Sequence, residues 1–185
     1  SEAERVLEEV RRLNDKSKKT AEKLTEENKR LNKRTTDFLK EVLERIEELV
    51  RRVEDRIRKE GTSREVKELV DRLKDRVREL IKEARKMVKE DDRRSEELVE
   101  RLKEIIERDR RTVEKLIEDL KRKSDDKRVK DIVREIRDSV RKLEEEVRKL
   151  IRENEKSNKD LRRRVRKIEE DIKRIIRELE ERVRK

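Results

Sequence analysis

Residues 39–57 read LKEVLERIEELVRRVEDRI, with apolar residues three or four positions apart and charged residues between them. This spacing is typical of one face of an amphipathic α-helix. The stripe continues in both directions, since Leu39 lies 18 residues after Ala21 and 18 residues before Ile57. Eighteen residues make five turns of 3.6 residues, so a stripe with this period runs straight along an untwisted helix, whereas a heptad repeat would supercoil.

The same period continues through the rest of the chain. The clearest series in the middle and last thirds are Val66, Ala84, Leu102, Leu120 and Val129, Val147, Val165, Val183. Charged residues make up 61% of the chain, a level found in disordered proteins, but disordered segments lack helical periodicity. Because the charged residues are mostly the good helix formers Glu, Lys and Arg, composition and period together predict long helices.

Two places interrupt the pattern. Gly61 suits the left-handed residue that follows a helix, and Thr62 with Glu65 has the spacing of a capping box. The second interruption offers three residues that could cap the next helix, Ser124, Asp125 and Asp126.

These interruptions divide the chain into helices over residues 2–60, 64–122 and 127–185, each about 88 Å long. Short connections make successive helices antiparallel neighbours. The predicted fold class is therefore all-α: an elongated, nearly untwisted, up-down-up antiparallel three-helix bundle that forms a single domain over residues 1–185.

Polar residues replace apolar ones at some positions of the repeat. Asn28 stands between Val10 and Ile46, and Asn154 stands between Ile136 and Ile172. The predicted polar positions in the core are Asn14, Ser17, Asn28, Asn32, Asp91, Ser95, Asp109, Thr112, Ser139, Asn154, Ser157 and Asn158. Aligning the helix centres puts them in two layers, one that includes Asn28, Asp91 and Asn154 and one that includes Asn14, Asp109 and Ser139.

We interpret these layers as buried hydrogen-bond networks that fix helix register, because a shifted helix would leave buried polar groups without partners. An active site or a metal site fits less well. The chain has no His or Cys, and the two inward acids, Asp91 and Asp109, are on one helix about 27 Å apart. The sequence therefore predicts no catalytic residue, no metal and no cofactor, with a ligand cavity as the weaker alternative.

Charge and hydropathy limit the partners and the location. The net charge of +11 comes from 62 basic and 51 acidic residues that interleave, and there are no aromatic residues arranged to stack on bases. We therefore expect no specific nucleic-acid binding, and at most weak, salt-sensitive binding of polyanions near residues 162–167. No apolar run is long enough for a membrane span and no signal peptide is visible, so we expect a soluble protein that stays in the cytoplasm of an expression host.

Equal helices, a connection of the Gly61-Thr62-Ser63 kind and polar layers at matched heights resemble de novo designed helical bundles, which are built from straight parametric helices with buried hydrogen-bond networks. The resemblance implies a very stable structural scaffold without natural biochemical activity, and not an enzyme. One alternative is a subunit of a designed homo- or hetero-oligomer that associates through the broad stripe of the first helix, at Leu7, Thr20, Phe38 and Leu43. A basic coiled-coil protein that binds polyanions is a further alternative.

Overall fold

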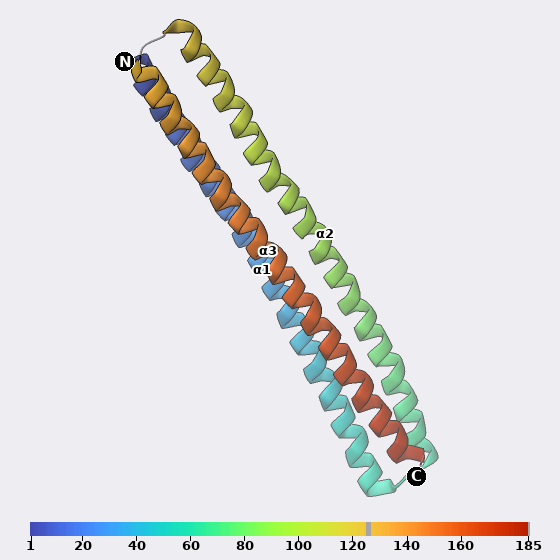
Figure 1. The fold of residues 1–185 in the computed structure, drawn as a ribbon. Coiled ribbons are helices and arrows are strands. Elements are labelled where there is room, and N and C mark those ends of the chain that lie inside the picture. The colour runs from blue at the N-terminus through green and yellow to red at the C-terminus, as the bar shows by residue number, and fades with distance from the viewer. Residues whose placement is uncertain (125–126, 185) are drawn as a thin grey trace. The chain divides into compact units, whose positions relative to one another are not determined.

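The chain folds into three α-helices in a computed structural model that describes residues 1–124 and 127–184 (Figure 1). Helix α1 spans Glu2–Glu60, α2 spans Arg64–Lys123 and α3 spans Lys127–Arg184. The described residues contain no strand, so the prediction of an all-α three-helix bundle is confirmed. Helix α2 ends one residue later than predicted, and Lys185, the predicted end of the third helix, lies outside the described residues.

The contacts divide the chain into two compact units, and each unit contains part of all three helices. Unit 1 consists of Ser1–Lys29 and Arg94–Lys156, and unit 2 consists of Arg30–Arg93 and Ser157–Lys185. That the whole chain is a single domain stays a prediction.

The buried positions follow the 18-residue period along each helix. In α1, for example, Val10, Asn28 and Ile46 are all buried, and charged side chains between them face solvent. In α3 the same holds for Val129, Val147, Val165 and Val183. Because five turns bring a side chain back to the same angle, each helix keeps one face inward.

In unit 1, α1 and α3 run in the same direction and α2 runs against both. The ammonium group of Lys123, at the end of α2, lies 3.0 Å from the carboxylate of Glu2, at the start of α1. Along α1 and α3 the ion pairs advance together, from Arg11 with Glu135 to Lys18 with Glu146. Two apolar clusters fill this unit, one around Val10, Ile117 and Ile136 and the other around Ala21, Leu102 and Val147.

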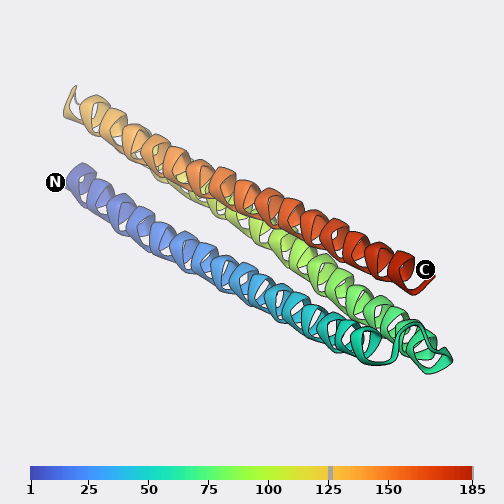
Figure 2. The ribbon, with the colours of Figure 1, turned by 90° about the horizontal axis from the view of Figure 1, so that it is seen from below.

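Unit 2 has the same arrangement. Its α2 residues pair with α3 in reverse order, Asp92 with Arg162 and Arg85 with Glu169, so these helices are antiparallel. The end of α3 lies at the same end of the unit as the connection from α1 to α2 (Figure 2). The larger apolar cluster of the unit contains Ile46, Leu80 and Ile172, and the smaller one contains Leu39, Ala84, Leu161 and Val165.

The connection between α1 and α2 uses the predicted glycine but a different capping residue. Gly61 has a φ of 69°, and its N–H donates to the carbonyl of Ile57 at 2.8 Å, as expected for the left-handed residue after a helix. The first residue of α2 is Arg64, which makes Ser63 the N-cap: its hydroxyl accepts from the N–H of Val66 at 3.2 Å. The expectation of a capping box from Thr62 is wrong, because the helix begins one residue later than that box requires.

At the second connection, the N–H of Ser124 donates to the carbonyl of Leu120 at 3.2 Å, which extends the hydrogen bonding of α2 by one residue. The other two predicted caps, Asp125 and Asp126, lie outside the described residues.

Candidate functional site

Three buried polar residues, one from each helix, meet in unit 1. Asn28 on α1 donates through its amide nitrogen to Oδ1 of Asn154 on α3, and Asn154 Nδ2 donates to the hydroxyl of Ser95 on α2 at 2.9 Å. All three side chains are buried. We call them the Asn154 cluster. Asn154 both donates and accepts, so it links the other two helices, although Oδ1 of Asn28 has no hydrogen-bond partner among the described residues.

A second group of polar residues in unit 1 contains two separate pairs. Asn14 Nδ2 donates to the hydroxyl of the half-buried Ser139 at 2.6 Å, which joins α1 to α3. Ser17 donates a hydrogen bond to the carboxylate of Asp109, which joins α1 to α2. Thr112, predicted to lie in this layer, is exposed, so that prediction is wrong. The adjacent Val113 is buried and takes the inward position instead.

The carboxyl group of Asp109 is only partly compensated for its burial. The residue is 2% exposed, and its Oδ2 atom has no hydrogen-bond partner among the described residues. Burial raises the pKa of Asp109, because a charged carboxylate is costly to remove from water. The hydrogen bond from Ser17 and the positive charge of Arg108 oppose this rise. Asp109 is therefore a buried acid whose protonation is coupled to the folded state.

In unit 2, a buried carboxylate lies at the centre of a third group, the Asp91 cluster, which consists of Asn32, Asp91, Ser157 and Asn158. Amide nitrogen and oxygen are distinguished by their hydrogen-bond partners, and Asp91 can only accept when ionised. The Asn32 nitrogen therefore faces Asp91 and donates to its two oxygens at 2.9 and 3.0 Å. The Asn32 oxygen accepts from Ser157 at 2.7 Å, and Asn158 Oδ1 lies 3.2 Å from the Asn32 nitrogen. Asn32 thus connects α2 to α3.

Two other buried hydroxyl groups do not join helices. Thr25 donates to the carbonyl of Ala21 at 2.9 Å, and Thr35 donates to the carbonyl of Leu31 at 3.2 Å, each within α1. A threonine that donates to the carbonyl four residues earlier satisfies its own hydroxyl. These residues therefore differ from the asparagines, whose amide groups reach across to another helix.

The arrangement provides hydrogen bonds between helices and little catalytic chemistry. In the part of the chain that the structure describes, no three His, Cys, Asp or Glu side chains are grouped as a metal site would require. The buried carboxylates there are Asp91 and Asp109, one in each unit, and so neither unit has a buried acid pair. No helix within residues 1–124 and 127–184 has an apolar stretch long enough to cross a membrane.

The residues expected to form an oligomer interface on α1 differ in exposure. Leu7 is buried within the apolar cluster of unit 1, and Thr20 is exposed and donates to the carbonyl of Lys16. Phe38 and Leu43 are half-buried against the core of unit 2. No large hydrophobic side chain among the described residues is fully exposed.

Comparison with known proteins shows the fold. No protein-family model matches the chain, and no curated protein has a similar sequence. A solved structure described as a "Computationally designed three helix bundle" is similar, with a TM-score of 0.52 and 17% sequence identity, over 98% of this chain and 89% of that one. At this identity the similarity concerns the three-helix architecture alone.

Proposed function

We propose that the chain is a designed structural scaffold without natural biochemical activity, in which buried polar groups fix how the three helices fit together. The observation that carries the proposal is the Asn154 cluster, in which one asparagine hydrogen-bonds to polar side chains from both other helices inside an apolar core. The regular 18-residue period and the similarity to a designed three-helix bundle support a designed origin.

Buried polar residues favour one arrangement of the helices over others of similar hydrophobic burial. Apolar side chains that recur every few residues tolerate a helix that slides by one turn, because leucine and valine pack against many partners. A slide would take Asn28 and Ser95 away from Asn154, and each buried group left without a partner would cost about 1–3 kcal/mol. The Asn154 cluster thus disfavours shifted registers more than it stabilises the correct one.

The experiment compares one single and one triple variant by unfolding in guanidinium chloride and by amide NMR. Asn28→Leu should lower the free energy of unfolding by about 1–3 kcal/mol, since Asn154 loses its donor and stays buried. The triple variant Asn28→Leu, Ser95→Ala, Asn154→Leu should be as stable as the parent or more so. Its NMR spectrum should contain extra amide signals, because helix register is no longer fixed.

Two results would contradict the proposal. One is an Asn28→Leu variant as stable as the parent, which would mean that the hydrogen bonds do not contribute. The other is a triple variant with a single sharp set of amide signals, which would mean that apolar packing alone fixes the register. A natural protein with a related sequence and the same polar positions would contradict the designed origin.

A further inference from the structure

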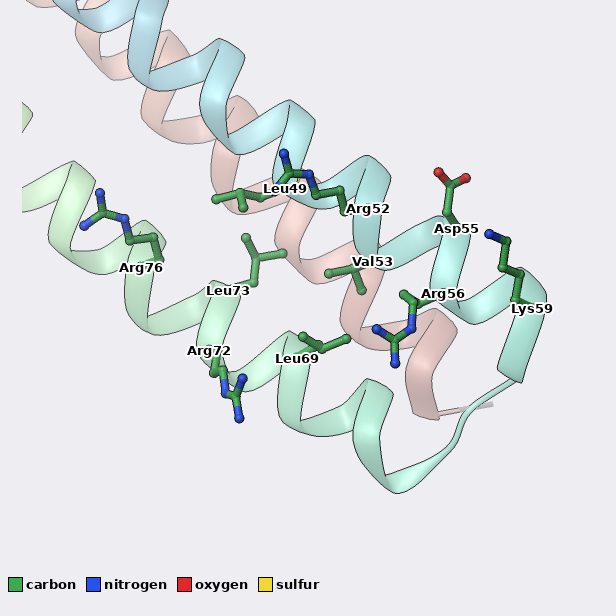
Figure 3. Close-up of a pocket in the computed structure, with 10 residues that line it drawn as sticks. All are labelled: Leu49, Arg52, Val53, Asp55, Arg56, Lys59, Leu69, Arg72, Leu73 and Arg76. Atoms are coloured by element: carbon green, nitrogen blue, oxygen red, sulfur yellow. The ribbon is translucent and has the colours of Figure 1, made fainter.

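A surface groove lies between the end of α1 and the start of α2 in unit 2, with a volume of about 530 Å³ (Figure 3). We call it the α1–α2 groove. Leu49 and Val53 from α1 and Leu69 and Leu73 from α2 point toward one another across it. Val53 and Leu73 are buried, whereas Leu49 and Leu69 are half-buried and form the apolar surface that a ligand would touch.

The rim of this groove is strongly basic. Its charged residues are Arg52, Arg56, Lys59, Arg72, Arg76 and the single acid Asp55. Three of the arginines have acidic partners on the protein surface: Arg52 with Glu48, Arg76 with Glu79, and Arg56 with both Glu60 and Glu65.

Three cationic groups at the rim are incompletely matched. Among the described residues, neither Lys59 nor Arg72 has a carboxylate within ion-pair distance, so their charges are not neutralised by the protein. The Nε–H of Arg56 is buried and has no hydrogen-bond acceptor in the described part of the chain. A buried guanidinium N–H without an acceptor can donate to an anion that enters the groove.

We propose that the α1–α2 groove binds a small amphiphilic anion, in which a carboxylate or sulfonate group is attached to an aromatic or alkyl body. The apolar body lies on Leu49 and Leu69, and the anionic group faces Arg56 and Arg72. The volume is in the range of pockets that take small molecules, and the apolar floor with a few polar groups at its edge is typical of them. This site is independent of the scaffold function, because none of its residues belongs to the buried polar clusters.

Unit 1 contains a groove that separates the effect of charge from the effect of the apolar floor. Its volume is about 490 Å³, and its rim also carries several cations, including Lys130 and Arg134. Its apolar lining is limited to Val129 and Val133, both already buried, so an apolar ligand body has little to contact. Paired substitutions in the two grooves can therefore remove the same charge from different surroundings.

The test titrates the whole chain with anilinonaphthalenesulfonate, a fluorescent amphiphilic anion, and follows amide NMR signals in parallel. We expect saturable binding of one probe per chain, with shifts concentrated in residues 49–76. The double variant Lys59→Gln, Arg72→Gln should bind about fivefold more weakly, while Lys130→Gln, Arg134→Gln should bind as the parent does. Leu69→Gln should also weaken binding, and circular dichroism checks that each variant keeps its helices.

A second probe tests the need for the anion. Neutral N-phenylnaphthylamine, which lacks the sulfonate, should bind at least about fivefold more weakly than anilinonaphthalenesulfonate. Equal weakening by the two charge-matched double variants would overturn the proposal, since binding would then follow net charge alone. Binding without saturation, unchanged binding by Leu69→Gln, or equal affinity for the neutral probe would each overturn it as well.

Discussion

Asp109 links the stability of the fold to pH through a single buried carboxyl group. Because burial raises its pKa in the folded chain, the folded state binds this proton more tightly than the unfolded state does. The contribution of Asp109 to stability is therefore complete below the unfolded pKa near 3.9 and is lost as pH rises through the higher folded value. This direction is opposite to that of a carboxylate held in a strong ion pair.

We predict that the parent gains stability relative to the Asp109→Asn variant as the pH is lowered from about 7 to about 4. Asparagine has nearly the same volume and does not titrate, so the difference between the two proteins isolates the carboxyl group. Guanidinium chloride unfolding at a series of pH values measures it. A difference that does not change with pH would show that the pKa of Asp109 is the same in both states.

The Asp91 cluster allows a test of a single pair of side chains. Asn32 donates to both oxygens of Asp91, and hydrogen bonds to charged groups are the stronger ones. We predict a coupling energy of about 1.5–3 kcal/mol in a double-mutant cycle of Asn32→Ala and Asp91→Ala. The control cycle pairs Asp91→Ala with Thr112→Ala, an exposed residue about 30 Å further along the same helix, where coupling should be near zero.

Which polar side chains pair with which was only partly predictable from the sequence. The repeat places Asn28 and Asn154 at equal heights, and they are hydrogen-bonded. The same argument grouped Asn28 with Asp91, whereas Asp91 lies in unit 2 and has Asn32 as a donor. Heights are set by helix length, but partners depend on amide orientation and on angles finer than the 100° between successive residues. Thr112 was misplaced for the same reason.

At the scale of the elements, the helices were predictable because nothing inside them competes with helix formation. Proline is absent, and the single glycine, Gly61, stands at the one turn where a positive φ is needed. The capping residue was not predictable, since Thr62 and Ser63 are both good N-caps and the sequence does not decide which one precedes the first helical residue. The α1–α2 groove was also missed, because it depends on how two helices diverge locally.

We predict that Ser63→Ala lowers the free energy of unfolding by about 1 kcal/mol, because the N–H of Val66 loses its acceptor. Thr62→Ala, the neighbouring substitution of the same kind, should change stability by less than about 0.5 kcal/mol. Thermal or denaturant unfolding of the two variants measures both effects. The reverse order would mean that α2 begins at the capping box of Thr62 in solution.

At the scale of the whole molecule, long regular helices around apolar clusters should unfold only at high temperature. We predict a cooperative transition above about 90 °C, since idealised helical proteins are usually very stable. The buried polar groups lower this value, Oδ2 of Asp109 most of all, because it lacks a partner among the described residues. A circular-dichroism melt below about 65 °C would mean that the polar clusters are poorly compensated.

We predict that the chain is a monomer of 22.9 kDa by multi-angle light scattering. Leu7 is buried and Thr20 is exposed, so the first half of α1 lacks the apolar surface that an interface needs. Phe38 and Leu43 are half-buried and remain the candidates for association. A dimeric or trimeric mass would favour an oligomer subunit, and Phe38→Lys should then return the protein to a monomer.

The 18-residue burial period has a consequence for how this architecture could be resized. Adding 18 residues to each helix at corresponding heights returns every later side chain to its original angle, so inward and outward faces keep their identity. Each addition lengthens a helix by about 27 Å and brings one further set of inward positions, which can be apolar or polar. An addition of seven residues would instead turn the following face by about 20°. Helix length can thus be changed in discrete increments while the interior lattice of side chains stays in phase.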